Sequence, residues 1–318
     1  MNTKPLYPKH IKRNISGILL LDKPHGVSSN RALQIIKRSF AATKAGHTGT
    51  LDPLATGLLP ICLGEATKFS SALLGADKTY EVVMRMGYIS TTGDAEGEIS
   101  VVGDTKMMPK SIGTALQDFI GNITQIPPMY SALKYRGKPL YTYAREGIQI
   151  ERKPRQVTIY DLQIDTLSGE EMSIKVRCST GTYIRTLAED IGRTLGCGGA
   201  YVTVLRRSTV NDFDLSQSYT LDQLEGMSLS QRDSCLYPSD RLLHNFSAVM
   251  LESVQVKLLL QGQIVTSPLS LNGLIVGEKV RLYDMGKKFL GLGEVTTEGE
   301  IAPRRLVSEE TFTAEVGL

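Results

Sequence analysis

The segment Gly46–Pro53 constrains this chain most strongly, because it fixes one carboxylate in a stiff, polar turn. Pro53 fixes its own φ angle, lacks an amide hydrogen and pushes Asp52 towards an extended conformation. An apolar run follows at once, so we expect Asp52 to lie at the edge of a buried core, where a carboxylate can serve in catalysis. The same pattern is also typical of an ordinary tight turn in which an aspartate caps a backbone N–H. Composition alone leaves both interpretations open.

The totals place the chain among globular proteins of ordinary composition. Its 318 residues, 41% apolar and 22% charged, suffice for one large domain and one small one. No apolar run approaches the ~20 residues that cross a membrane, and the polar N-terminus lacks a signal-peptide core, so we expect a cytoplasmic protein without a membrane partner. Four cysteines without a Cys-x-x-Cys pair and four histidines without ligand spacing predict neither a metal site nor a disulfide framework.

Positive charge is concentrated at the front of the chain. Residues 1–44 carry nine Lys or Arg and one acid, whereas residues 208–318 carry nine Lys or Arg and fifteen acids. This asymmetry favours a polyanionic partner for the first part of the chain, although a solvated basic arm would give the same count.

Gly46–Pro53, together with the Ala55–Pro60 stretch that follows, closely resembles the catalytic motif of the TruB family of tRNA pseudouridine synthases. The resemblance is strong over residues 15–210 and looser beyond them. It implies an α/β (α+β) catalytic domain with a mixed, largely antiparallel sheet in residues 1–248. It also implies a small PUA-like, RNA-binding β-barrel in residues 249–318.

The same resemblance assigns roles to further residues, with Asp52 as the catalytic one. Tyr80 opens a strand whose residues alternate between apolar and polar; by itself it could be a core aromatic, but it matches the family's active-site tyrosine. Arg185 lies in the first turn of a predicted helix, where an arginine is unfavourable unless a carboxylate faces it. It matches the family's arginine partner of the catalytic aspartate, and we expect it to lower the pKa of Asp52. The substrate-binding residues that we expect beside Tyr80 are His47, Tyr183, Leu205, Lys23 and Lys68.

A basic, tyrosine-rich stretch covers residues 127–154. Four of the thirteen tyrosines fall within fourteen residues there, interleaved with Lys and Arg. Such a mixture can grip phosphates and stack on bases, and the TruB family has an RNA-gripping insertion at this place. A surface loop with solvated side chains would have the same composition. The predicted RNA-binding residues are Tyr130, Lys134, Arg136, Lys138, Arg152, Lys153 and Arg155.

The function implied by the resemblance is the isomerisation of uridine 55 in the T-loop of tRNA to pseudouridine, after the base is flipped out. The reaction moves the base from an N1–C1′ to a C5–C1′ bond without oxidation, so we expect no cofactor and no metal. We expect a monomer that binds the T-arm of tRNA without a guide RNA. Two other classes stay open: a non-catalytic RNA-binding or RNA-folding protein, and a carboxylate hydrolase, which would need a second acid. A guide-RNA-dependent synthase is the near relative to exclude, and the compact C-terminal module favours a stand-alone enzyme.

Overall fold

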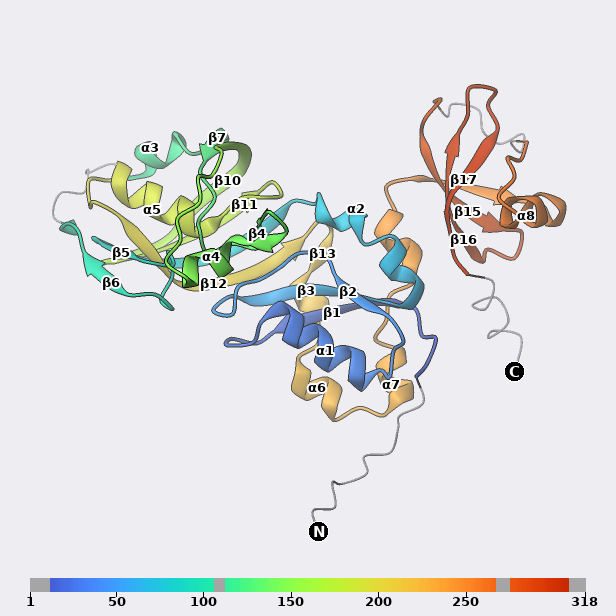
Figure 1. Ribbon diagram of the computed structural model, residues 1–318, viewed down its shortest axis with the longest axis horizontal. Helices are drawn as coiled ribbons and strands as arrows, with labels where there is room; N and C mark the ends of the chain where they lie inside the picture. The colour runs from blue at the N-terminus through green and yellow to red at the C-terminus, as the bar shows by residue number, and fades with distance from the viewer. Residues whose placement is uncertain (1–11, 106–111, 267–274, 309–318) are drawn as a thin grey trace, which may run out of the picture.

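The structure, a computed structural model, describes residues 12–105, 112–266 and 275–308. Its main body is a nine-stranded sheet (Figure 1). The strands are β1 (Gly17–Lys23), β2 (Ala45–His47), β3 (Thr56–Leu63), β4 (Lys78–Met86), β7 (Gly121–Gln125), β10 (Arg155–Ser168), β11 (Glu171–Cys178), β12 (Ala200–Val210) and β13 (Phe213–Asp214). Their order is β1-β3-β12-β4-β11-β10-β7, with β2 beside β3 and β13 beside β12. Only the β3–β12 pair is parallel in this described sheet, which confirms the predicted mixed, largely antiparallel architecture.

One half of this sheet is buried on both faces. Successive residues of a strand point to opposite faces, so the unbroken apolar run in β1 fills two cores at once. Leu19 and Leu21 contribute to the first core, and Ile18 and Leu20 to the second. The first core includes α1 (Ser29–Ser39) and α5 (Ile184–Thr194). The second includes η1 (Gly64–Lys68), α2 (Ser71–Leu74) and η4 (Ser239–Leu243).

Helix α5 forms where the sequence predicts a helix, and α1 is the second long helix of this core. The hydroxyl of Ser28 caps α1 by accepting the amide N–H of Arg31 at 3.2 Å. In α5, the buried residues Ile184, Leu187 and Ile191 repeat at helical spacing. Both helices pack into the same core, so the loops at their N-termini lie on one side of the sheet.

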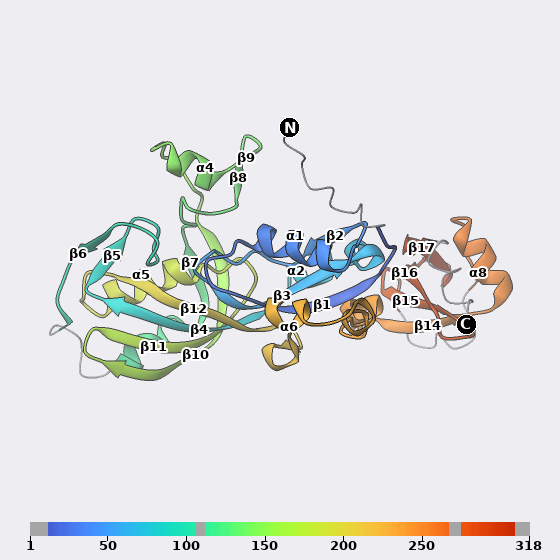
Figure 2. The ribbon, with the colours of Figure 1, turned by 90° about the horizontal axis from the view of Figure 1, so that it is seen from below.

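The predicted insertion at residues 127–154 projects from the body (Figure 2). It contains β8 (Lys134–Tyr135), β9 (Lys138–Pro139) and α4 (Leu140–Arg145). The two strands are joined by Arg136 and Gly137, whose φ angles of 47° and 84° suit a two-residue type I′ turn. The hairpin therefore has a defined conformation and presents basic residues at its tip.

The C-terminal strands form a separate four-stranded sheet, β14-β15-β16-β17. Its elements are β14 (Ser247–Leu251), α8 (Ser253–Leu260), β15 (Lys279–Asp284), β16 (Phe289–Val295) and β17 (Ile301–Leu306). This sheet has its own core and is consistent with the predicted PUA-like domain. The closed barrel is not established, because β14 and β17 remain the two edges of the sheet among the described residues. Since β14 begins at Ser247, we propose a domain boundary just before it rather than after residue 248.

The remaining elements are short. They are β5 (Tyr88–Ser90), β6 (Ile99–Val101), α3 (Ile112–Gln117), η3 (Leu215–Gln217), α6 (Leu221–Glu225) and α7 (Leu229–Asp233). The polar segment between β5 and β6 brings Asp94 against Val202 of β12. Within the described ranges, no helix has the length and apolar character needed to cross a membrane.

Candidate active site

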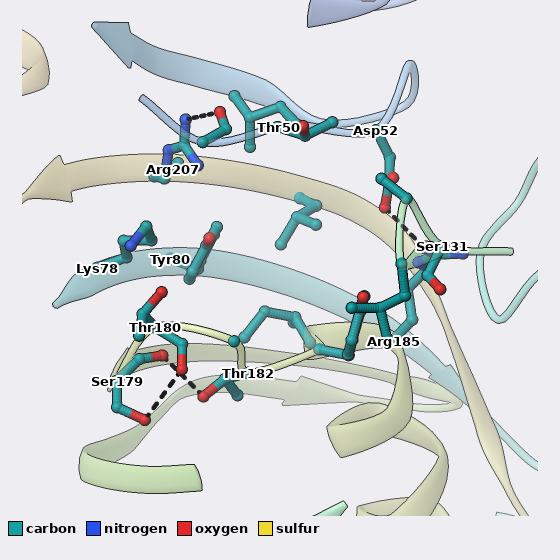
Figure 3. A pocket seen from close by; sticks show the side chains of 18 of the residues that line it. Thr50, Asp52, Lys78, Tyr80, Ser131, Ser179, Thr180, Thr182, Arg185 and Arg207 are labelled. Atoms are coloured by element: carbon teal, nitrogen blue, oxygen red, sulfur yellow. Dashed lines mark hydrogen bonds and ion pairs between the residues drawn. The ribbon is translucent and has the colours of Figure 1, made fainter. Parts of the chain in front are cut away.

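A cavity lies between the loop of Asp52, strands β4 and β12, the start of α5 and the root of the insertion (Figure 3). Its volume is about 310 Å³, at the small end of the roughly 300–1,000 Å³ that ligand pockets span. Such a volume suits one nucleotide and is too small for a paired helix. The walls include Gly49, Asp52, Lys78, Tyr80, Ser131, Arg155, Thr180, Tyr183, Arg185, Leu205 and Arg207.

The loop of Asp52 is tied to the body on both sides of the carboxylate. Before it, the hydroxyl of Ser29 accepts the N–H of Leu51 at 2.8 Å and donates to its carbonyl at 2.9 Å. After it, the carbonyl of Pro53 accepts the ammonium of the buried Lys23 at 3.4 Å. The Asp52 side chain keeps 37% of its surface exposed and lines the cavity. The predicted position at the edge of a buried core is confirmed.

Arg185 holds the carboxylate in place. Its Nη2 lies 3.0 Å from Oδ2 of Asp52, and its Nη1 lies 3.6 Å from Oδ2 of Asp94. The same guanidinium donates to the carbonyls of Thr92 at 2.6 Å and Tyr130 at 2.8 Å. Two carboxylates thus face the arginine in the first turn of α5, where the helix dipole alone would disfavour it. The pairing of Arg185 with Asp52 is as predicted, and Asp94 is an additional partner.

The pKa of Asp52 does not follow the expectation based on the arginine alone. Burial raises it, and this effect outweighs the attraction of Arg185. Asp94 raises the pKa further, whereas Lys23 opposes the rise. The reason is that the protein around the carboxylate removes part of the hydration that stabilises its charge. Arg185 therefore lowers the pKa of Asp52 as predicted, but burial makes the net shift upward, and Arg185 acts to limit the cost of keeping Asp52 charged.

Part of the cavity wall is made of aromatic and aliphatic side chains. Tyr80 of β4 and Leu205 of β12 contribute to its walls and are almost fully buried. Burial raises the pKa of Tyr80, so its phenol stays neutral at ordinary pH. Tyr183 also lines the cavity, with the guanidinium of Arg155 4.6 Å from its ring centroid. Aromatic and aliphatic walls of this kind can hold a planar base.

The end of the cavity away from Asp52 is positive (Figure 3). Arg207 is only 1% exposed and donates to the carbonyls of Leu58 at 2.7 Å and Gly49 at 3.3 Å. Lys78 is also buried, and burial followed by repulsion from Arg207 lowers its pKa to about 8. The cavity is therefore polarised, with a carboxylate at one end and two cations at the other.

Lys78 and Arg207 were not among the predicted site residues, although the sequence holds a local signal for them. Lys78 lies two residues before Tyr80, and Arg207 two residues after Leu205, so each shares a strand face with a predicted site residue. The placement of Arg207 also depends on Gly57 of the neighbouring strand, whose φ is +98°. A Cβ at that glycine would lie 2.3 Å from the carbonyl oxygen of Arg207.

Three predicted substrate-binding residues do not line the cavity. Lys23 is fully buried, donates only to backbone carbonyls among its described partners, and has its pKa lowered to about 8 by burial. His47 lies in β2, and burial followed by the charge of Arg207 lowers its pKa. Lys68 pairs with Glu65 at 2.6 Å and donates to the carbonyl of Leu306 at 3.0 Å. It therefore joins η1 to the C-terminal domain instead of reaching the cavity.

The predicted RNA-binding residues divide into two groups. Lys134, Arg136, Lys138 and Lys153 are exposed, the first three of them along the hairpin. The others lie nearer the body: Tyr130 binds Arg185 through its carbonyl, Arg152 donates to the carbonyl of Pro127 at 3.2 Å, and Arg155 lines the cavity. A hairpin of exposed cations beside a nucleotide-sized, polarised cavity is the arrangement expected of an enzyme that modifies single nucleotides of an RNA.

Comparison with known proteins specifies this class. Family models match residues 37–184 (TruB family pseudouridylate synthase, N-terminal domain), 185–244 (tRNA pseudouridylate synthase B C-terminal domain) and 247–307 (pseudouridine synthase II TruB, C-terminal). The tRNA pseudouridine synthase B of Nitrosospira multiformis is 60% identical over 94% of this chain and 97% of its own length. That of Nitrosomonas europaea is 56% identical over 91% and 95%. The chain belongs to the TruB family of pseudouridine synthases, isomerases that convert uridine in tRNA to pseudouridine.

The fold is shared with more distant solved structures. A chain of a Cbf5-Nop10-Gar1 complex superimposes with a TM-score of 0.65 at 24% identity, covering 92% of this chain and 85% of that one. This likeness extends the shared architecture through both the large sheet and the C-terminal region.

Proposed function

We propose that this enzyme isomerises uridine 55 in the T-loop of tRNA, with Asp52 as the catalytic carboxylate and the target uridine flipped into the cavity. The observation that carries the proposal is the Asp52 carboxylate, held 3.0 Å from the buried Arg185 at one end of a nucleotide-sized cavity. Tyr80, Tyr183 and Leu205 supply the walls around the base.

Access to the cavity requires base flipping, because a base stacked inside a folded loop cannot enter a space of about 310 Å³. Flipping costs a few kcal/mol. Stacking of a base on an aromatic side chain contributes about 1–3 kcal/mol, so contact with Tyr80 offsets part of the cost. His47 lies outside the cavity in β2, so we propose that it contacts the T-loop rather than the flipped base.

The chemistry begins at the ribose. The N1–C1′ bond breaks and its electron pair stays on the uracil, while Asp52 either bonds to C1′ or removes a ribose proton. Arg185 orients Asp52 and limits the cost of its charge. Lys78 and Arg207, at the other end, stabilise the negative charge that the uracil ring carries on its oxygens. The ring then turns and C5 bonds to C1′. On the first route this breaks the Asp52–C1′ bond, and on the second the ribose regains its proton. The C5 hydrogen leaves as a proton and N1 takes one up, so atoms and electrons balance without a cofactor.

The insertion and the front of the chain provide the grip on tRNA. Lys134, Arg136 and Lys138 are exposed on the hairpin, where they can neutralise phosphates of the T-arm. The chain from residue 208 onwards, which includes the C-terminal domain, is acidic in balance, so this domain extends the binding surface instead of forming the main phosphate clamp. We propose a monomer that needs no guide RNA, since the cavity and the hairpin belong to the same chain.

The test is to incubate an unmodified tRNA transcript with the pure protein alone and to map pseudouridine by position. We expect modification at position 55 and none in a matched transcript with cytidine there. Modification at another position would contradict the proposed target, and dependence on an added RNA would contradict the stand-alone mode. Tight binding without any pseudouridine would favour a non-catalytic RNA-binding protein.

A further inference from the structure

Ser131 is a cavity residue to which neither the sequence nor the chemistry above gives a role. It is only 4% exposed and lines the same cavity as Asp52 (Figure 3). Its hydroxyl is buried and finds no hydrogen-bond partner among the residues that the structure describes. A buried hydroxyl left without a partner is unfavourable, so its natural partner is a group that enters the cavity.

The position of Ser131 is fixed by the root of the insertion. Its N–H donates to the carbonyl of Met129 at 2.9 Å, and its carbonyl accepts the N–H of Tyr141 at 3.1 Å. These bonds hold the backbone on both sides of the side chain, so the hydroxyl stays on the cavity wall.

Ser131 lies at the carboxylate end of the cavity. The carbonyl of the preceding residue, Tyr130, accepts a hydrogen bond from Nη2 of Arg185 at 2.8 Å. This Nη2 also lies 3.0 Å from Oδ2 of Asp52. Figure 3 shows Ser131 beside this ion pair, with Lys78 and Arg207 at the far end. The serine hydroxyl therefore faces the part of the substrate on which Asp52 acts.

That part is the ribose, an assignment that rests on the function proposed above. Within an RNA chain, the 3′ and 5′ oxygens of a ribose are esterified, so its one free hydroxyl is the 2′-hydroxyl, on the carbon next to C1′. A hydroxyl both donates and accepts hydrogen bonds, which matches the serine. We propose that Ser131 is a substrate-binding residue that hydrogen-bonds the ribose 2′-hydroxyl of the target uridine. It thereby distinguishes ribose from deoxyribose at that nucleotide.

The test compares Ser131→Ala with the wild type on two tRNAs that differ only in carrying uridine or 2′-deoxyuridine at position 55. We expect kcat/KM to fall about fivefold to tenfold in the variant on the ribose substrate and less than twofold on the deoxyribose substrate. Any intrinsic effect of the missing hydroxyl on the chemistry cancels, because each substrate is compared with itself. The dissociation constants of the two enzymes for the two tRNAs should follow the same pattern, with a larger change on the ribose substrate than on the deoxyribose substrate.

Thr180→Val is the matched control. Thr180 lines the same cavity, but its hydroxyl already donates to the carbonyl of Leu74 at 2.7 Å, so any loss should be equal on both substrates. Ser131→Ala should leave Tm unchanged, because no described protein bond to its hydroxyl is removed.

An equal loss on both tRNAs would assign Ser131 to a phosphate or base contact and overturn the inference, as would no loss on either. These results leave the proposed function intact. Failure of the wild type to form pseudouridine at position 55 of the ribose substrate would instead overturn the proposed function, and the inference with it.

Discussion

Arg185 and the insertion hairpin present the same kind of charge in opposite surroundings. Arg185 is 5% exposed and binds two carboxylates and two carbonyls. Lys134, Arg136 and Lys138 are exposed along a projecting hairpin. A buried cation is strongly coupled to its few partners, whereas exposed cations act over a distance and are screened by salt. The comparison separates organisation of the reacting carboxylate from capture of the RNA.

The largest expected effect follows from removing the charge of Asp52. Asp52→Asn should lower turnover by several orders of magnitude while tRNA affinity stays within a few-fold, because the amide is nearly isosteric but cannot serve as nucleophile or base. Rates at saturating tRNA and dissociation constants measure the two effects. Asp165→Asn, on the exposed part of β10, is the control and should keep full activity. Substantial residual turnover in Asp52→Asn would move the chemistry to another residue.

Arg185→Lys should have the next largest effect. A lysine keeps the charge but has no planar fork to bind Asp52, Asp94 and two carbonyls together, so we expect a fall in kcat of about a hundredfold. Arg206→Lys on β12 is the matched control, because Arg206 pairs with Asp22 at 2.7 Å in a part-exposed pair outside the cavity. Equal losses in the two variants would mean that the buried network has no special role.

Replacing Lys134, Arg136 and Lys138 together by alanine should weaken tRNA capture without a comparable loss of chemistry. Each lost phosphate contact flattens the slope of log affinity against log salt by about 0.7–0.9, so the triple variant should lose about two units of slope. KM should rise, and Tm should barely change because exposed charges contribute little to folding. An unchanged slope with a lowered Tm would show that these side chains hold the fold together.

The raised pKa of Asp52 predicts a pH effect in the buried region alone. The folded protein holds the Asp52 proton more tightly than the unfolded chain does, so ionising Asp52 lowers the free energy of unfolding. This loss grows as pH rises from the usual aspartate range towards the raised pKa. The Tm of Asp52→Asn relative to wild type should therefore increase with pH across this window. Asp94→Asn removes a charge that raises the pKa, so the acid limb of the single-turnover rate should move to lower pH. If the acid limb of the rate profile does not move in Asp94→Asn, Asp94 has no influence on the ionisation of Asp52.

The smallest expected effect is that of chelators. The described residues contain no group of three or more His, Cys, Asp or Glu that could hold a metal ion, and the isomerisation has no redox step. EDTA should leave the rate unchanged when the tRNA is folded beforehand and its folding is monitored as a control. Activity lost with EDTA and restored by one specific divalent ion, with tRNA folding unaffected, would contradict this expectation.

The features that the sequence predicts well are local ones. The stiff turn at Asp52, the alternation in β4 and the helix α5 at Arg185 each depend on a few neighbouring residues. The cation at Arg207 depends instead on the parallel pairing of β3 with β12, between segments about 150 positions apart, which no local pattern reveals. The sequence pointed to Arg207 only indirectly, through the predicted site residue Leu205 two positions earlier on the same face of the strand.

Two further differences have the same origin. Lys68 lies close to the catalytic motif in sequence, yet its ammonium donates to the carbonyl of Leu306 in the C-terminal domain. The pKa of Asp52 depends on the balance between burial and Arg185, and the sequence shows the arginine but not how closely protein surrounds the carboxylate. Such balances require the three-dimensional structure.

The most direct test of the account measures single-turnover rate and tRNA dissociation constant side by side for Asp52→Asn and for the Lys134, Arg136 and Lys138 triple alanine variant. We predict a crossed result: the first variant loses the rate and keeps the affinity, and the second loses affinity and keeps the rate at saturating enzyme. Proportional loss of both quantities in both variants would contradict the separation of a buried catalytic centre from an exposed RNA grip.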